Sequence, residues 1–185
     1  MVVKLPPYIP TNDGFNYQTS MTDQDMQQMV EWGIKIVRLG VMWEAVERSP
    51  GFYDMDYLAQ IDSLINRFAQ YDIAVIVDNH QDLFSRQLCG EGVPWFYTPK
   101  KLDHRCPETL LAQAFHLAGE CVSLNSYAMP VDENGLPLVS ACQQHDFMTM
   151  YTAPEIASAF AGLYNNEDGL RDKLMQFWSV ISEFF

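Results

Sequence analysis

The sequence has few basic residues: 11 lysines and arginines stand against 24 aspartates and glutamates, so the formal net charge is −13 at pH 7. The basic residues form no stripe, and a chain of this charge is repelled by phosphate backbones. Nucleic acid is therefore excluded as an expected partner.

Long hydrophobic runs are also missing. No apolar stretch approaches the roughly 18 residues that cross a bilayer. Pro6, Pro7 and Pro10 interrupt the start, so we expect no secretory leader there, which leaves the compartment open because leaders are removed from mature proteins. The sequence has no repeat and no low-complexity segment. Its 185 residues, 48% of them hydrophobic, predict a single globular domain over residues 1–185 with a sizeable core.

Cysteine is scarce, and its spacing does not suit a metal or redox site. Cys89, Cys106, Cys121 and Cys142 fall within one stretch of 54 residues and form no C-x-x-C pair, which argues against structural zinc and a thioredoxin-type site. Four cysteines allow two disulfides in three pairings. Small buried thiols are an equally good interpretation, and both stay open.

What the sequence does have is an alternation of amphipathic and β-branched segments. Residues 34–39 and 73–78 are typical of buried strands. Ser20 and Asp23 resemble a capping box that opens a helix, with Gly33 as its stop. A helix of about four turns before the second strand is marked by an apolar stripe: Leu58, Ile61, Leu64, Ile65 and Phe68. This order indicates βα units and a parallel sheet.

Regularity fades between residues 84 and 150, where the only helical candidate is 108–122. It resumes where Thr152 and Glu155 form a T-x-x-E capping box that predicts a helix through Tyr164. A last amphipathic helix is expected over residues 170–181.

Polar residues interrupt both predicted strands near their carboxyl ends, where parallel α/β folds bind ligands. Arg38 lies in the first, and we expect it to meet a carboxylate because an unpaired buried guanidinium is costly. A structural role tying two barrel strands together is the alternative. The second strand ends in Asp78, His80 and Asp82, whose two-residue spacing places them on one face if the backbone stays extended.

The D-x-H-x-D pattern has two interpretations. Histidine and carboxylates are ordinary metal ligands, but no second His/Asp cluster exists in the sequence to complete a site, since His104, His116 and His145 are scattered. We therefore favour a hydrogen-bonding set for a polar ligand such as a sugar. Nearby aromatic residues could serve as stacking platforms, although each is more often part of a core: Trp43, Trp95 and Phe96.

Several stretches together resemble one enzyme family. They are "KLPPYIP", "WGIKIVRLGVMWEAVERSPGFYD", "IVDNHQDLFSRQLCGEGVPWF" and "FAGLYNNEDGLRDKLMQFWSVISEFF". They are similar to the N-terminal half of endoglycoceramidase-related glycosidases of glycoside hydrolase family 5. The resemblance runs from about Val2 to Phe185 and is weakest over 93–150. The "HQDLFS…CGEGVPWF" block is specific for this subgroup, whereas "VRLGVMWEAVE" points only to the wider family.

The resemblance implies an α/β fold, a (β/α)8 TIM barrel that hydrolyses the β-glycosidic bond between glycan and ceramide with retention. Retaining enzymes use two carboxyl groups about 5–5.5 Å apart, which in the family are glutamates after strands four and seven. A barrel needs about 250 residues. We therefore expect a truncated N-terminal portion of the domain: roughly three βα units, a remnant of strand one at "VVK", and a long insertion after strand three. Such a piece contains no catalytic residue and should be inactive alone.

Other glutamates in the chain do not replace the catalytic pair. Asn166-Glu167 resembles the family's asparagine–glutamate motif but falls in a predicted turn between helices. Glu44 and Glu47 follow strand two, where a helix-start or loop role is expected. Glu91 lies nearer the cleft, and we assign it no catalytic role.

The resemblance carries over only binding and supporting roles. Lys4, His80 and Asp82 match residues that bind the glycan. Arg38 matches an arginine that keeps the nucleophile ionised, because a nearby cation favours the charged form, and Asp78 is expected to support it. No cofactor and no metal are implied.

The expected partner is a glycolipid or oligosaccharide, with peripheral contact to a membrane surface through the missing half. The family favours a secreted or lysosomal-type compartment. Two alternatives stay open: a β-glucan or β-mannan hydrolase on the same barrel, and a non-catalytic sugar-binding half-barrel that assembles with a partner. The oligomeric state is open as well.

Overall fold

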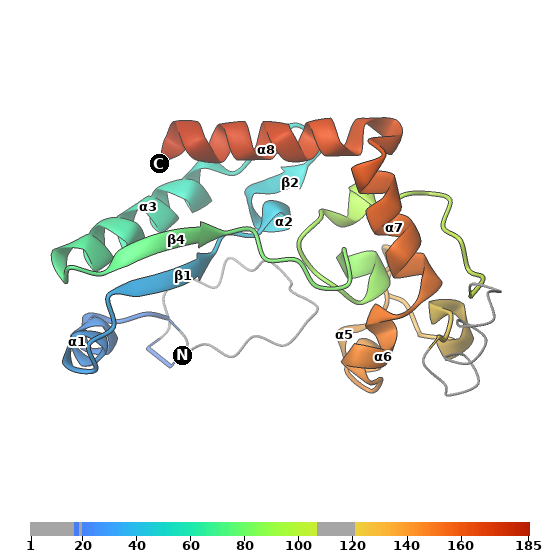
Figure 1. Ribbon diagram of the computed structural model, residues 1–185, viewed down its shortest axis with the longest axis horizontal. Coiled ribbons are helices and arrows are strands. Elements are labelled where there is room, and N and C mark those ends of the chain that lie inside the picture. The colour runs from blue at the N-terminus through green and yellow to red at the C-terminus, as the bar shows by residue number, and fades with distance from the viewer. Residues whose placement is uncertain (1–16, 19, 107–120) are drawn as a thin grey trace.

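The structure is a computed structural model that describes residues 17–18, 20–106 and 121–185. Within these residues it is a mixed α/β arrangement with two small sheets and no closed sheet (Figure 1). The remnant of strand one, Lys4 and most of the helix expected over 108–122 lie outside the described residues. Within the described part, no helix is both long enough and apolar enough to cross a bilayer.

The principal sheet pairs β1 (Ile36–Gly40) with β4 (Ala74–Asp78) in parallel, in register from Ile36 opposite Ala74 to Gly40 opposite Asp78. This confirms the two predicted strands. The connection between them carries α2 (Trp43–Val46), the antiparallel hairpin β2 (Glu47–Ser49) and β3 (Phe52–Tyr53), and α3 (Met55–Gln70). The carboxyl ends of β1 and β4 therefore meet at one edge, as a parallel sheet requires.

The four-turn helix predicted before the second strand is α3. Asp54 is its N-cap and accepts a hydrogen bond from the backbone N–H of Tyr57 at 2.9 Å. Leu58, Ile61 and Phe68 of the predicted stripe are buried. Because these residues recur at helical spacing, they lie on one side of α3, and that side packs into the interior.

The predicted start of the first helix is wrong by two residues. Helix α1 spans Asp23–Glu31 and is capped by Thr22, whose side chain accepts from the N–H of Asp25 at 3.2 Å, while the Asp25 carboxylate accepts the N–H of Thr22 at 2.8 Å. This is a reciprocal capping box. Ser20 and Asp23 have the right chemistry, but the pair Thr22–Asp25 satisfies two backbone donors at once.

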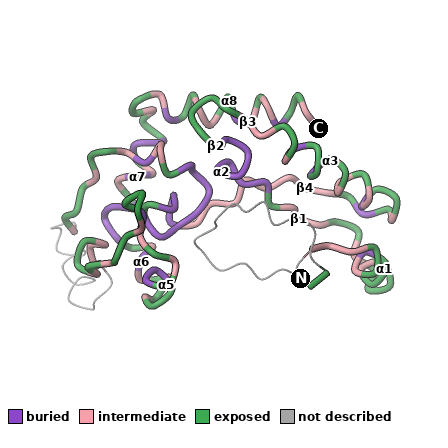
Figure 2. The backbone as a smooth tube through the Cα atoms, turned by 180° about the vertical axis from the view of Figure 1, so that it is seen from behind, coloured by how far each residue is buried: buried purple, intermediate pink, exposed green. Residues whose placement is uncertain are grey.

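Beyond β4 the chain forms turns and short helices, and two longer helices, α7 and α8, make up its C-terminal part. The described helices after β4 are η1 (Arg86–Leu88), η2 (Trp95–Tyr97), η3 (Leu124–Tyr127), α5 (Val139–Cys142), α6 (Phe147–Tyr151), α7 (Pro154–Tyr164), η4 (Glu167–Gly169) and α8 (Leu170–Phe184). Burial is concentrated around α2 and along the segment that follows β4, whereas α1 and α3 show long exposed stretches (Figure 2).

The capping box predicted at Thr152 is also wrong. Thr152 ends α6, and the N-cap of α7 is Ala153, which makes no side-chain cap hydrogen bond. Helix α7 starts with Pro154, whose fixed φ and missing N–H suit the first helical position. Glu155 lies in the first turn, and its carboxylate contacts His104, Ser123 and Leu124, which lie outside the helix.

Along one face of the principal sheet, the described residues are largely exposed. Ile36 in β1 and Ile76 in β4 are 59% and 56% exposed, and Arg38 and Ala74 on the same face are exposed as well. On the opposite face, Leu39 and Val77 are partly buried and pack against the core cluster that includes Leu58 of α3 and Phe177 of α8.

Candidate functional site

The candidate site begins with an ion pair at the carboxyl edge of the principal sheet. Arg38 Nε lies 3.3 Å from Asp78 Oδ2 across the β1–β4 pair. This confirms the expected carboxylate partner of Arg38. The guanidinium is not buried, however, because the side chain is 66% exposed on the exposed face of the sheet.

His80 joins the two aspartates that flank it. Its Nδ1 lies 3.4 Å from Asp78 Oδ2, and its Nε2 lies 2.9 Å from Asp82 Oδ2. An ionised carboxylate only accepts hydrogen bonds, so the Nε2–H donates to Asp82. The three polar residues predicted to share one side of the strand end do come together, although β4 itself ends at Asp78.

Asp82 has a further partner that the sequence did not reveal. The hydroxyl of Tyr151, at the end of α6, donates to Asp82 Oδ1 across 69 residues of chain. Burial, the hydrogen bond to Asp82 and the nearby negative charge together raise the pKa of Tyr151 to about 12. The phenol is therefore a neutral donor at physiological pH.

A tight loop holds Asp82 from the backbone side. The N–H of Asp82 donates to the carbonyl of Glu91 at 3.1 Å, and the N–H of Glu91 donates back at 2.7 Å. The glycines of "CGEG" make this approach possible. A Cβ on Gly90 would lie 2.0 Å from the Asp82 carbonyl oxygen, and Gly92 has φ = +114°, a conformation that side chains disfavour.

Glu91 supplies a third group that could bind a metal ion. One ligand atom each of His80, Asp82 and Glu91 lie within 4.8 Å of one another. The sequence offered no second His/Asp cluster to complete a metal set, and the third group here is a glutamate that the loop brings back onto the strand end. Glu91 is 2% exposed, whereas His80 and Asp82 are partly open to solvent.

Glu44 and Glu47 support the site from behind. Glu44 Oε1 accepts the N–H of Gly92 at 3.0 Å, which ties α2 to the loop. Glu47 Oε2 accepts the indole N–H of Trp43 at 2.6 Å, and its Oε1 accepts the hydroxyl of Tyr97 at 2.6 Å. Burial, this hydrogen bond and the charge of Glu47 raise the pKa of Tyr97. The helix-start role expected from the sequence is confirmed for Glu44, in the first turn of α2, whereas Glu47 is the first residue of β2.

The predicted stacking platforms separate into core and surface. Trp43 is fully buried against Tyr97 and Phe177, so its suggested role as a platform is wrong. Trp95 is 43% exposed, and Phe96 packs against it edge to face. Trp95 remains a candidate.

The insertion after β4 is fastened by two disulfides, Cys89–Cys142 and Cys106–Cys121. This settles the pairing that spacing left open. The first connects the "CGEG" loop to α5, which precedes α6 and its Tyr151.

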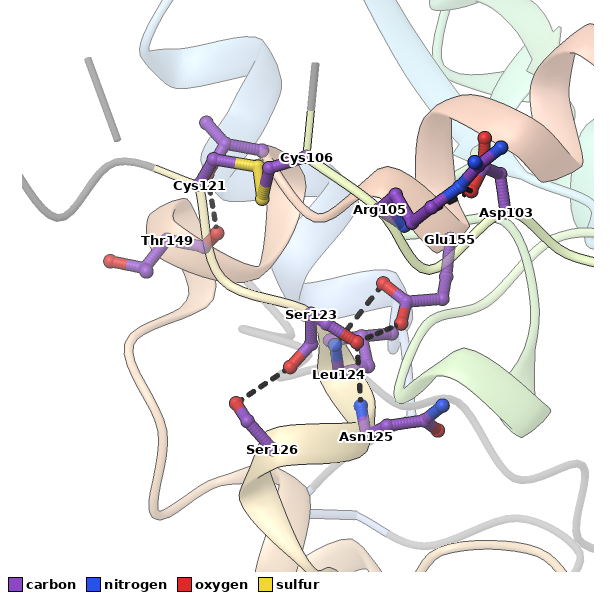
Figure 3. Close-up of a disulfide and its surroundings, with 11 residues drawn as sticks. Asp103, Arg105, Cys106, Cys121, Ser123, Leu124, Asn125, Ser126, Thr149 and Glu155 are labelled. Carbon is purple, nitrogen blue, oxygen red and sulfur yellow. Dashed lines mark hydrogen bonds and ion pairs between the residues drawn. A yellow bond between two sulfur atoms is a disulfide. The ribbon is translucent and has the colours of Figure 1, made fainter. Parts of the chain in front are cut away.

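A second polar cluster surrounds Glu155 (Figure 3). Its carboxylate accepts hydrogen bonds from the Ser123 hydroxyl and from the Leu124 N–H at 3.1 Å, and it lies 2.8 Å from His104 Nδ1. Burial alone would raise the pKa of Glu155, but the hydrogen bonds from Ser123 and His104 outweigh it and hold this pKa below its usual value. A cavity of about 450 Å³ adjoins the cluster.

Lys4 lies outside the described residues, so its predicted place at the site stays a prediction. Glu167 lies in η4, the turn between α7 and α8, with Asn166 as its N-cap. This confirms the predicted turn.

Comparisons with known proteins identify the family of the chain. The model of the cellulase family, glycosyl hydrolase family 5, matches residues 7–105. An endoglycoceramidase from Cyanea nozakii is 30% identical over 186 residues, and one from Hydra vulgaris is 31% identical over 187. Both alignments cover 100% of this chain but only 34% and 33% of the relatives. The chain thus spans about a third of their length.

Solved structures show the same fold. Endo-glycoceramidase II from Rhodococcus sp., as a complex with a five-membered iminocyclitol, matches with a TM-score of 0.62 and 20% identity over 90% of this chain and 32% of that one. An endogalactoceramidase matches with a TM-score of 0.61 over 96% of this chain and 34% of that one. The described α/β arrangement is accordingly part of a (β/α)8 barrel. With the family model matching more than half of its residues, the chain belongs to glycosyl hydrolase family 5 and is related to the endoglycoceramidases.

Proposed function

We propose that this chain forms one wall of the sugar-binding cleft of a retaining β-glycosidase that separates glycan from ceramide in glycosphingolipids. The observation that carries the proposal is the pair His80–Asp82, joined at 2.9 Å beyond the carboxyl end of β4 and partly open to solvent. Ligands bind at that end of the strands in barrels of this kind. The names of the relatives supply the substrate class.

Two of the solved structures support a lactose-containing glycan in this proposal. Endo-glycoceramidase II structures include a lactosyl-enzyme intermediate and a ganglioside GM3 complex. In this chain, Asp82 would accept hydrogen bonds from sugar hydroxyls and His80 would stand beside it, with Lys4 as a further glycan contact. Arg38 and Asp78 would support the pair and the catalytic nucleophile.

The catalytic glutamates are a separate matter. A retaining pair needs two accessible carboxyl groups about 5–5.5 Å apart. Asp82 and Glu91 approach this spacing, with oxygens within 4.8 Å. Glu91, however, is 2% exposed, and Asp82 is engaged by His80 and Tyr151. Neither can attack an anomeric carbon. We propose that the whole protein carries its catalytic pair outside these 185 residues and that the chain alone is inactive.

The two described disulfides support a proposal about the compartment. Disulfides form and persist mainly in oxidising surroundings and are rare in the cytosol. We therefore propose that the protein folds in the secretory pathway or its equivalent, in line with a secreted or lysosomal-type destination.

A second candidate function is hydrolysis of a β-glucan or β-mannan. The family model that matches residues 7–105 is described as cellulase, which favours a polysaccharide substrate. The two candidates share the sugar wall and differ in what lies beyond the scissile bond.

Lactose binding by the 185-residue chain tests the proposed wall. We expect lactose to shift the backbone amide signals of His80 and Asp82 in two-dimensional NMR, and Asp82→Asn to weaken the response about tenfold, since hydrogen bonds to charged groups are strong. Asp72→Asn is the matched control, because Asp72 is an exposed carboxylate paired with Lys35 at 2.8 Å away from the site. The proposed sugar-binding wall would be contradicted if the unmodified chain, Asp82→Asn and Asp72→Asn all showed the same amide shifts. It would also be contradicted if no shifts appeared at high millimolar lactose.

The substrate class is tested on the longer protein that contains this chain. Hydrolysis of fluorescent glucosylceramide or lactosylceramide, with no activity on cello-oligosaccharides, is expected. The reverse preference would favour the polysaccharide hydrolase.

A further inference from the structure

We propose that Tyr151 is a positioning residue of the site: its hydroxyl fixes the carboxylate of Asp82 and, through it, the imidazole of His80. The inference deepens the proposed function, because it says which residue keeps the sugar-facing pair in place. The relationship between the three side chains is independent of which sugar binds.

The first step is that the two oxygens of the Asp82 carboxylate have different partners. Oδ1 accepts from the Tyr151 hydroxyl, and Oδ2 lies 2.9 Å from His80 Nε2. Because each oxygen has a different donor, rotation of the carboxylate about the Cβ–Cγ bond of Asp82 breaks both contacts. Each oxygen keeps further acceptor capacity, since an ionised carboxylate has about four lone-pair sites. Asp82 is thus held in one orientation while still able to accept hydroxyl groups.

The second step is that the backbone and the partner are themselves fixed. Asp82 is bonded in both directions to the backbone of Glu91, at 3.1 Å and 2.7 Å. Tyr151 packs edge to face on Phe147, with ring centroids 5.1 Å apart, and its neighbour Met150 is buried. The hydroxyl therefore approaches Asp82 from a packed element.

The third step concerns how that element reaches the site. Helix α6 follows α5, and α5 ends in Cys142, which is disulfide-bonded to Cys89 of the "CGEG" loop. The covalent link holds the loop bearing Glu91 and the segment bearing Tyr151 on the same side of the molecule. The insertion after β4 thus contributes directly to the order of the strand end.

The fourth step is the choice of a phenol. A lysine or arginine in the same place would also hold Asp82, but it would neutralise the carboxylate. The Tyr151 phenol, with its pKa raised to about 12, stays neutral and donates one hydrogen bond to a charged acceptor. Such charge-assisted bonds are roughly twice as strong as neutral ones. The phenol thus holds Asp82 without placing a positive charge beside it.

Tyr151→Phe is the test, because it removes one oxygen and leaves the ring against Phe147. Tyr164→Phe is the matched control: Tyr164 ends α7 and its side chain is largely exposed. Three quantities are measured on the 185-residue chain: the downfield ¹H signal of the His80 Nε2–H, the Kd for lactose, and the thermal midpoint.

We expect Tyr151→Phe to shift or broaden the His80 signal and to weaken lactose binding about tenfold, while Tyr164→Phe changes neither. A lower thermal midpoint with an unchanged His80 signal and an unchanged Kd would show a purely structural hydroxyl and would overturn the inference. If the unmodified chain does not bind lactose, but the His80 signal still responds to Tyr151→Phe, the positioning role stands and the proposed sugar wall fails.

A second variant approaches the same contact from the other side. In Asp82→Asn, the charge that opposes ionisation of the phenol is removed, so the pKa of Tyr151, followed by ¹³Cζ-tyrosine NMR, should fall below about 12, while burial, the larger cause, continues to hold it above its ordinary value. A titration that is the same with aspartate and asparagine at position 82 would show that the two side chains do not interact, and would also overturn the inference.

Discussion

Glu47, the first residue of β2, accepts the indole N–H of Trp43, the first residue of α2, at 2.6 Å, and both residues are buried. The same carboxylate accepts the Tyr97 hydroxyl at 2.6 Å and the Gly51 N–H at 2.7 Å. Three donors from different parts of the chain thus depend on one glutamate.

Replacing this carboxylate should be costly. Glu47→Ala leaves the buried donors of Trp43 and Tyr97 without their acceptor, and we expect a loss of about 3 kcal/mol in the free energy of unfolding. Urea denaturation measures it. Glu183→Ala is the control, because Glu183 lies near the exposed end of α8 and bonds only Ser179 among the described contacts. Equal losses in the two variants would show that the Glu47 hub adds no stability.

We expect replacement of Gly90, in the "CGEG" loop, to cost much more stability than replacement of Gly40 in β1. Gly90→Ala places a Cβ 2.0 Å from the Asp82 carbonyl oxygen. Since the obstacle is backbone, we expect about 3 kcal/mol or more of destabilisation and a disturbed Asp82–Glu91 pair. Gly40→Ala should be nearly neutral, because a Cβ at that position would meet no atom of the described residues within 4 Å. Denaturation midpoints that fall equally for the two variants would refute the close approach.

Glu155 gives a dependence of stability on pH. Its pKa is lowered in the folded chain, so its contribution is fully present above the ordinary carboxyl value of about 4.5 and is lost as pH falls through the lower folded value. Glu155→Gln should therefore destabilise the chain at pH 7 and lose less stability on acidification. Denaturant titrations at several pH values check this. Parallel pH profiles for the two proteins would show that Glu155 is not the responsible group.

The two disulfides should differ in how much they contribute to the free energy of unfolding. Their cysteines are separated by 53 and 15 residues, and loop-closure entropy predicts about 4 and 3 kcal/mol respectively. Replacing each pair by serine and measuring the free energy of unfolding tests the order. Because Cys142 precedes the helix that bears Tyr151, only the Cys89/Cys142 replacement should also weaken lactose binding. Weaker binding after the Cys106/Cys121 replacement would contradict that division.

Local patterns predicted local structure well. The two β-branched runs became β1 and β4, the apolar stripe became α3, and Arg38 found its carboxylate at the paired strand end. Each of these depends on residues close in sequence or on the rule that parallel strands end together. The errors at Ser20 and Thr152 have the same origin, because several nearby residues offer cap chemistry and only packing selects among them.

The candidate site was predictable in its strand-end residues and unpredictable in what holds them. Tyr151 reaches Asp82 across 69 residues, and nothing in its sequence surroundings distinguishes it from other tyrosines. Glu91 is only nine positions from Asp82, but its return depends on the backbone close to Gly90 and Gly92. The disulfide pairing was open for the same reason: spacing permits three pairings, and the folded path of the insertion chooses one.

The exposed face of the principal sheet has a consequence for the life of the chain in a cell. Parallel sheets are ordinarily covered on both faces, and here Ile36 and Ile76 are exposed on a sheet in which, among the described residues, β1 and β4 pair only with each other. Chaperones that recognise exposed aliphatic side chains would retain this stretch, and quality-control proteases would reach it first. We expect its abundance in a cell to depend on how soon another surface covers that face.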